Sequence, residues 1–138
     1  MTARVVSVRP DDSVQVAISR MMEEHVGSVA VCEGSHLVGI FTERDVLRLA
    51  SEGSGFGDVR IGDVMTRSPL TVASDVSIAD AAKLMGERRV RHLPVVEGDM
   101  IVGMLGIRDV MRMLMERVWR DHDEAAHDTA GALLQRGG

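Results

Sequence analysis

Apolar residues recur at helical spacing in two stretches, each of which follows a short polar segment. The polar segments are Asp11-Asp12-Ser13 and residues 74–77. The apolar positions are Val14, Ala17, Ile18, Met21 and Met22 in the first stretch, and Ile78, Ala81, Ala82 and Met85 in the second. Because Ser and Asp side chains cap the free amides at a helix start, this pattern predicts two amphipathic helices.

Each predicted helix is followed by two short apolar runs on either side of a glycine turn. The runs are 29–32 and 37–41 around Glu33-Gly34-Ser35, and 93–96 and 101–105 around Glu97-Gly98-Asp99. Such runs indicate buried β-hairpins. A further helix is expected to start near Arg44 and near Arg108, and the second of these runs to about Arg120. Its apolar stripe consists of Met111, Leu114, Met115, Val118 and Trp119.

The whole pattern occurs twice. A shift of 64 positions superimposes residues 1–50 on residues 65–114 without a gap, so that Asp45 falls on Asp109. One such unit buries too little apolar surface to be stable alone. The sequence therefore predicts an α/β (α+β) fold of two β-α-β-β-α repeats packed about a pseudo-twofold axis. The expected divisions are repeat 1 (1–50), a Gly-rich linker (51–62), repeat 2 with an extended C-terminal helix (63–120) and a polar, flexible tail (121–138).

Composition narrows the class of protein. The chain has 138 residues, of which 45% are hydrophobic and 27% charged, and its net charge is −5. These values fit one compact domain and disfavour a nucleic-acid partner, because no basic stripe is present. No apolar run approaches the roughly 20 residues of a membrane helix, and no signal pattern is found, so no membrane partner and a cytoplasmic location are expected. The single Cys32 is interpreted as a small apolar residue on a buried strand.

Motifs for catalysis are missing from the sequence. The five histidines have no metal-ligand spacing, and neither a Gly-x-Ser-x-Gly elbow nor a phosphate-binding Walker loop is present. We therefore expect a protein that is not an enzyme, has no catalytic or metal-binding residues and requires no cofactor.

Thr42, Arg44 and Asp45 are candidate ligand-binding residues at the start of a helix. A carboxylate at this place can accept hydrogen bonds from two ribose hydroxyls, while the Thr hydroxyl and the helix N-terminus favour phosphate. The alternative is that Asp45 only accepts hydrogen bonds from backbone amides of the first helical turn. The recurrence of the same carboxylate at Asp109 favours the ligand-binding interpretation.

Arg91 and His92 are the second pair of candidates. Cations at the end of a helix interact favourably with its dipole, and this account covers Arg88 and Arg89 well. Arg91 and His92, however, directly precede a buried strand, which is expected to carry them to the seam between the repeats.

These segments resemble those of CBS domains. Gly39–Asp45 and Gly103–Asp109 are similar to the family signature Gly-apolar-apolar-Thr/Ser-x-x-Asp. Residues 90–95 resemble the second-strand segment of the family, residues 63–66 resemble its opening segment, and the resemblance covers about residues 1–118. It implies a tandem CBS pair, or Bateman module, that binds AMP, ADP, ATP or another adenosyl ligand and regulates an attached or associated effector protein.

The resemblance implies two unequal nucleotide sites. The main site would consist of Thr42, Arg44 and Asp45 of repeat 1 with Thr66, Leu70, Thr71, Arg91 and His92 of repeat 2. The second site would consist of Thr2, Val6, Ser7, Arg108 and Asp109. Here Gly106 replaces the signature Thr, and Gly27-Ser28 stand where repeat 2 has Arg91-His92. The second site is therefore expected to be degraded.

Two further expectations concern assembly. The extended stripe with Met111, Met115 and Trp119 predicts a homodimer through helices, as is common for Bateman modules. A ligand-free CBS scaffold that only mediates dimerisation or partner binding is the alternative function. The sequence is compatible both with a complete short protein and with a piece of a longer one, and it does not identify the regulated target.

Overall fold

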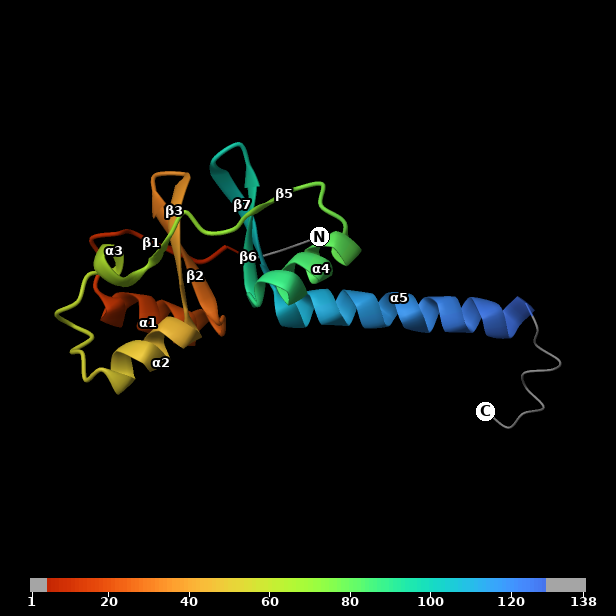
Figure 1. The fold of residues 1–138 in the computed structure, drawn as a ribbon, viewed down its shortest axis with the longest axis horizontal. Coiled ribbons are helices and arrows are strands. Elements are labelled where there is room, and N and C mark those ends of the chain that lie inside the picture. The colour runs from red at the N-terminus through yellow and green to blue at the C-terminus, as the bar shows by residue number, and fades with distance from the viewer. Residues whose placement is uncertain (1–4, 129–138) are drawn as a thin grey trace.

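The structure is a computed structural model that describes the backbone of residues 5–128 and the side chains as far as Asp121 (Figure 1). Repeat 1 contains β1 (Ser7–Val8), α1 (Val14–Glu24), β2 (Ser28–Glu33), β3 (His36–Thr42) and α2 (Glu43–Ser51). Repeat 2 contains α3 (Ile61–Val64), β4 (Thr66–Arg67), β5 (Val72–Ala73), α4 (Ile78–Arg88), β6 (His92–Glu97), β7 (Met100–Gly106) and α5 (Ile107–Asp128). The predicted β-α-β-β-α unit is therefore present twice. Helix α3 begins before the second copy, and the residues equivalent to β4, 2–3, lie outside the described residues.

Helices α1 and α4, which are equivalent in the two repeats, start and end in the same way. The side chains of Ser13 and Ser77 each accept a hydrogen bond from the backbone amide three residues later, at 3.2 Å and 3.0 Å. At the other end, His25 and Arg89 adopt a left-handed conformation with φ of 55° and 54°. Both helices thus end in the same αL cap, although neither cap residue is a glycine. The duplication seen in the sequence extends to these backbone details.

All the strands belong to one sheet in the order β1-β2-β3-β7-β6-β5, with β4 paired to β3. The hairpins β2–β3 and β6–β7 are antiparallel, whereas β1 and β5 run parallel to their neighbours. The two hairpins meet at the pair His36↔Met100, whose members are equivalent under the shift of 64. The pseudo-twofold axis consequently passes between them, and both hairpin turns point to the same side of the molecule (Figure 1).

Each repeat has its own core, and a third cluster lies between them. Phe41 and Leu105, which occupy equivalent positions, are almost completely buried in the two cores. The third cluster contains Ala30, Cys32, Ile40 and Met104. Cys32 is buried there, so its interpretation as a small apolar residue on a buried strand is confirmed, and burial raises the pKa of its thiol.

The prediction that the last helix ends near Arg120 is wrong, because α5 continues to Asp128. No Gly or Pro occurs between Ile107 and Gly131, and polar residues alone do not end a helix. The rest of the predicted tail, 129–138, lies outside the described residues.

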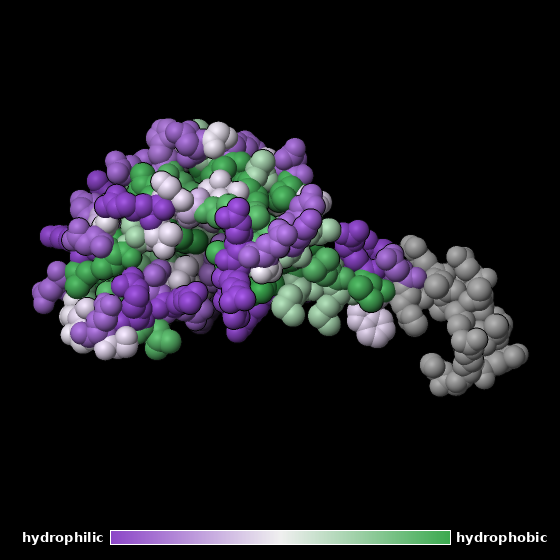
Figure 2. Space-filling view, viewed as in Figure 1, coloured by the Kyte–Doolittle hydropathy of each residue, from purple (hydrophilic) through white to green (hydrophobic). Residues whose placement is uncertain are grey.

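The last helix leaves the body of the molecule after its first turns. Leu114 still packs against the core of repeat 2, whereas Met115, Val118 and Trp119 are 58%, 68% and 64% exposed. Figure 2 shows this helix projecting from the molecule with apolar side chains along its lower edge. Among residues 5–128, no helix has the length and apolar character to cross a membrane.

Candidate functional site

The two repeats are joined at the tips of their hairpins. The backbone amide of Leu37 donates to the carbonyl of Asp99 at 3.2 Å, and that of Ile101 donates to the carbonyl of Ser35 at 3.3 Å. The exposed ring of His36 also contacts the Asp99 carboxylate, with Nδ1 3.0 Å from Oδ2. These contacts fix one end of the seam.

At the opposite end of the hairpins, the seam opens into a cavity of about 400 Å³. In repeat 1 the amide of Glu43 donates to the carbonyl of Gly27 at 3.0 Å, and in repeat 2 the amide of Ile107 donates to that of Arg91 at 2.8 Å. These equivalent bonds hold the start of α2 against the residue before β2, and the start of α5 against the residue before β6. The cavity is lined by His25, Val26, Gly27, Ser28 and Glu43 of repeat 1 and by Arg91, His92, Met104, Gly106, Ile107, Arg108 and Asp109 of repeat 2.

Two residues predicted to bind phosphate in the main site line this cavity, together with two residues predicted for the second site. Arg91 and His92 share it with Arg108 and Asp109, whereas Thr42, Arg44 and Asp45 are not among its lining residues. Glu43 connects the two groups, because it lines the cavity and is the residue between Thr42 and Arg44. The structure thus brings the predicted phosphate-binding pair of the main site and the Arg-Asp pair of the second site to one cavity between the repeats.

Asp45 takes part in the start of α2. Its Oδ2 accepts hydrogen bonds from the backbone amide of Thr42 at 2.9 Å and from the Thr42 hydroxyl at 3.3 Å. Its Oδ1 lies 3.4 Å from Nη2 of Arg48, and the side chain is 15% exposed. These contacts match the structural alternative for Asp45, but each carboxylate oxygen can accept two hydrogen bonds, so Oδ1 keeps capacity for a ligand.

Asp109 is more accessible than Asp45. Its side chain is 47% exposed, and its Oδ1 lies 3.3 Å from Nη2 of Arg112. Gly106 stands where repeat 1 has Thr42, so no hydroxyl contacts this carboxylate at the helix start. The pairing of each carboxylate with an arginine three residues later is a feature common to both repeats.

The three residues expected at the adenine edge lie on the chain segment that crosses from the linker into repeat 2. Thr66 belongs to β4 and pairs with Ile40 of β3, Leu70 packs against the core of repeat 2, and Thr71 directly precedes β5. Gly39 permits this crossing, because a Cβ there would lie only 2.8 Å from the carbonyl oxygen of Thr66. The first glycine of the signature is thus explained by close backbone approach.

Of the first-repeat residues predicted for the second site, the structure describes Val6 and Ser7, and neither lines the seam cavity. The side chain of Val6 is buried in the core of repeat 1 and is therefore not available to a ligand on the seam. Ser7 lines a different cavity, and Thr2 lies outside the described residues.

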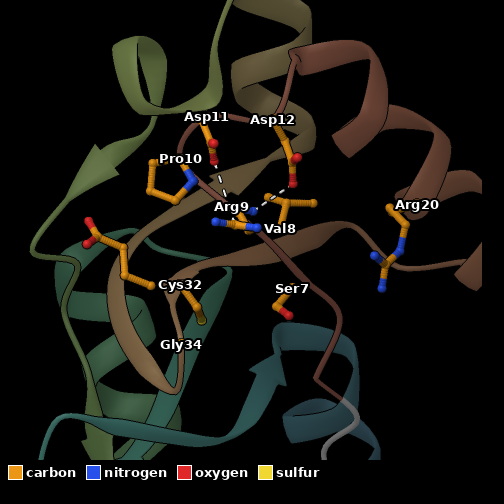
Figure 3. A pocket seen from close by; sticks show the side chains of 10 residues that line it. Ser7, Val8, Arg9, Pro10, Asp11, Asp12, Arg20, Cys32 and Gly34 are labelled. Carbon is orange, nitrogen blue, oxygen red and sulfur yellow. Dashed lines mark hydrogen bonds and ion pairs between the residues drawn. The ribbon is translucent and has the colours of Figure 1, made fainter.

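That other cavity, of about 840 Å³, lies beside β1 at the edge of the sheet (Figure 3). Figure 3 shows Arg9 beside the two aspartates of the following turn: its Nε is 3.7 Å from Oδ1 of Asp11, and its backbone amide donates to Asp12 at 2.8 Å. Glu33 adds a further carboxylate to the lining. Arg20 also lines the cavity, so three carboxylates stand beside two arginines, one of them paired, and this balance suits an anion less well than that of the seam.

The imidazole of His92 is a perturbed titratable group of the seam. The pKa of its imidazole lies below the ordinary value of 6.5, mainly because the ring is buried and also because Arg91 is nearby, while Glu43 and Asp109 act in the opposite direction. The ring lies next to repeat 1 at the seam, because a Cβ placed on Gly27 would be 3.3 Å from Cε1 of His92. The imidazole is therefore neutral near pH 7 and becomes a stronger phosphate ligand when protonated.

Glu43 was not among the residues predicted for the site. It occupies an unspecified position of the signature, so the resemblance gave it no role. The difference between Glu43 and its equivalent Ile107 is the signal that points to it, since a shift of 64 superimposes a carboxylate on an apolar side chain.

The comparisons with known proteins agree with this architecture. The family model of the CBS domain matches residues 1–52 and again residues 61–116. The CBS domain-containing protein YhcV of Bacillus subtilis is 32% identical over 111 residues, which cover 80% of this chain and 79% of that protein. In two other relatives the matched region spans 54% and 25% of the protein. The chain belongs to the CBS-domain family.

Solved structures show the same arrangement. The crystal structure of the CBS domain NE2398 superimposes with a TM-score of 0.77 at 34% identity, covering 82% of this chain and 89% of that one. The crystal structure of CBSX2 in complex with AMP superimposes with a TM-score of 0.73 at 34% identity, covering 84% of this chain and 92% of that one. The predicted pair of CBS repeats is thereby confirmed.

Proposed function

We propose that this chain is a regulatory module that binds an adenine nucleotide between its two CBS repeats. The observation that carries the proposal is the seam cavity, where Arg91 and Arg108 have no ion pair with the described residues and lie beside His92. Guanidinium groups at a cavity and the N-termini of α2 and α5 favour a phosphate group. The AMP complex of CBSX2, which has the same fold, supports an adenosyl ligand.

In this proposal the ribose and the phosphate are held by different repeats. Asp45 and Thr42 bind the ribose at the start of α2, and Arg91 and His92 bind phosphate from across the seam. Thr66, Leu70 and Thr71 lie along the adenine edge, and Arg44 stays near the mouth of the site. The second site, at Arg108 and Asp109, has a weaker affinity because Gly106 supplies no hydroxyl.

We also propose a homodimer that forms through the helices. Met111 on α5 and its equivalent Leu47 on α2 are 54% and 72% exposed, so both repeats present an apolar residue at the same place. The stripe continues along α5 through Met115 to Trp119. A second copy that covers this stripe would remove an exposed apolar surface from water.

The remaining elements of the proposal concern the cellular role. The module acts in the cytoplasm without catalysis of its own, requires no cofactor and passes its ligand state to an effector protein or domain. A ligand-free scaffold that only holds chains together remains the competing function, and the exposed stripe on α5 is the observation that favours it.

Calorimetric titration separates the two functions. ATP, ADP, AMP and S-adenosylmethionine are each titrated into the full chain at the same pH and salt concentration. The regulatory module gives saturable heat with at least one adenine nucleotide, whereas the scaffold gives none with any of the four ligands. Sedimentation of the same samples shows whether the oligomeric state changes on binding.

A further inference from the structure

Glu43 places a carboxylate in a cavity whose other groups suit an anion. The side chains of Arg91 and Arg108 reach this cavity from repeat 2, and Glu43 reaches it from repeat 1. Asp109, the other carboxylate, lies within 3.3 Å of the Arg112 guanidinium. Among the described residues, Glu43 has no hydrogen bond or ion pair through its side chain.

The position of this carboxylate is fixed by the backbone. The Glu43 amide donates to the Gly27 carbonyl at 3.0 Å, which holds the first residue of α2 against Gly27. A Cβ on Gly27 would lie 3.1 Å from Cδ of Glu43, and closer still to a carboxylate oxygen. The missing side chain at Gly27 is thus what leaves room for the carboxylate beside His92.

The fold does not require an acid at this position. Ile107, the equivalent residue of repeat 2, makes the same backbone hydrogen bond to Arg91 and begins a longer helix. A negative charge in a first helical turn is favourable through the helix dipole, but α5 forms without one at its first residue. Glu43 is therefore a difference between the repeats that affects the cavity rather than the packing.

The charges of the cavity are balanced before any ligand binds. Arg91 and Arg108 are offset by Glu43 and Asp109, and the buried imidazole of His92 is neutral near pH 7. In a cavity of about 400 Å³, charges on opposite walls interact within the screening length of about 8 Å at physiological salt. Each phosphate added to a ligand therefore meets the repulsion of Glu43 without a further cation to offset it.

We propose that Glu43 is a specificity-determining residue that makes the seam prefer a nucleoside monophosphate to the corresponding triphosphate. This inference rests on the proposed nucleotide-binding function and adds the class of ligand.

The test compares the affinities for adenosine, AMP and ATP by calorimetry in the wild type and in Glu43→Gln. Removal of the charge should raise the affinity for ATP about five- to tenfold relative to AMP and leave adenosine unchanged, and 0.5 M salt should reduce this difference. Glu43→Ile, which copies repeat 2, should behave like Glu43→Gln. Ile107→Glu should shift the preference further toward AMP. The matched control is Glu87→Gln, which removes a charge from an exposed position outside the cavity.

The outcomes distinguish the two proposals. An ATP-to-AMP affinity ratio that is the same in the wild type, Glu43→Gln and Glu43→Ile would overturn the role of Glu43 while leaving nucleotide binding intact. An equal change of the ratio in Glu87→Gln would overturn it as well, because the effect would then come from net charge alone. Absence of heat with AMP and ATP in the wild type would overturn the proposed function and this inference with it.

Discussion

Repeat 1 and repeat 2 share their helix caps and hairpins but contribute different side chains to the seam between them. The helix caps at Ser13 and Ser77 and the bonds from Glu43 and Ile107 to the hairpin strands are equivalent in the two copies. At the cavity, by contrast, repeat 1 contributes Gly27 and repeat 2 contributes Arg91 at the equivalent position. The comparison teaches that the copies share the positions that form the fold and differ at positions that line the seam cavity.

The copies also differ in the length of their last helix. In repeat 1, α2 ends at Ser51 and is followed by Gly53 with φ of 76°, a conformation that favours glycine. In repeat 2, α5 has 22 residues and no such residue stops it. The longer helix gives repeat 2 an apolar surface that repeat 1 lacks, and this surface is the place where assembly can be tested.

The largest expected effect concerns this surface. Trp119→Glu places a charge in the proposed helix contact, and truncation of a central aromatic residue in an interface costs about 2–4 kcal/mol, or roughly 30- to 1,000-fold in the dissociation constant of the dimer. Sedimentation equilibrium at tens of micromolar protein should show a wild-type dimer and a monomeric variant.

Arg120→Glu is the control for that prediction, since helical spacing places residue 120 on the side of α5 opposite the stripe. It should leave the dimer intact. A wild-type monomer, or a Trp119→Glu protein that dimerises as the wild type does, would remove α5 from the interface.

The next effect tests the two carboxylates against each other. Asp45→Ala should weaken AMP binding by about 1.5–3 kcal/mol, which is tenfold or more, because a charged acceptor of ribose hydrogen bonds is lost. Asp109→Ala should cost less, since no hydroxyl supports the equivalent site at Gly106. Equal losses in calorimetry under the same buffer and salt would contradict the asymmetry of the two sites.

Asp45→Ala also removes the acceptor of the Thr42 amide, which costs about 1 kcal/mol of stability at a helix start. Asp45→Asn keeps an oxygen for that amide and serves as the control. If Asp45→Asn binds AMP as the wild type does, Asp45 has only its structural role.

The fold was predictable because it rests on local patterns that the sequence repeats. Apolar spacing, serine caps and glycine turns predicted the helices and hairpins, and the shift of 64 predicted the pseudo-symmetry. Apolar spacing does not predict the end of α5, because the helix continues into a polar segment in which no helix-breaking residue occurs before Gly131. Helix propensity therefore predicts the length of such a segment better than hydrophobicity does.

The site was less predictable because it depends on contacts across the seam. The sequence predicted that Arg91 and His92 reach the seam, and the structure places them in its cavity. Arg91 and His92 share this cavity with Arg108 and Asp109 because the starts of α2 and α5 both lie close to the axis. That is a tertiary distance, which no local sequence pattern contains. Val6 was predicted from an alignment position, and in the structure it directly precedes β1 with its side chain in the core of repeat 1.

Arg91 allows the seam to be tested for phosphate binding separately from ribose binding. Arg91→Ala should weaken AMP about tenfold and leave adenosine nearly unchanged, because only the phosphate contact is charge-assisted. Arg89→Ala, at the helix cap outside the cavity, is the matched control and should change neither affinity. Calorimetry that shows equal losses for AMP and adenosine would rule out the phosphate role of Arg91.

The smallest effect concerns His92, whose equivalent in repeat 1, Ser28, does not titrate. Burial lowers the pKa of the folded imidazole below its ordinary value of 6.5, so between the two values the unfolded chain binds a proton that the folded chain does not. The free energy of unfolding should therefore decrease as the pH falls from 6.5 through the folded pKa, and this group should add no pH dependence above that range.

Urea unfolding at pH 7.5 and pH 5.5 should show a greater loss of stability in the wild type than in His92→Gln. Saturating AMP should reduce the difference, because phosphate beside the ring favours its protonated form. Identical losses in the two proteins would show that His92 does not control the pH response of the seam.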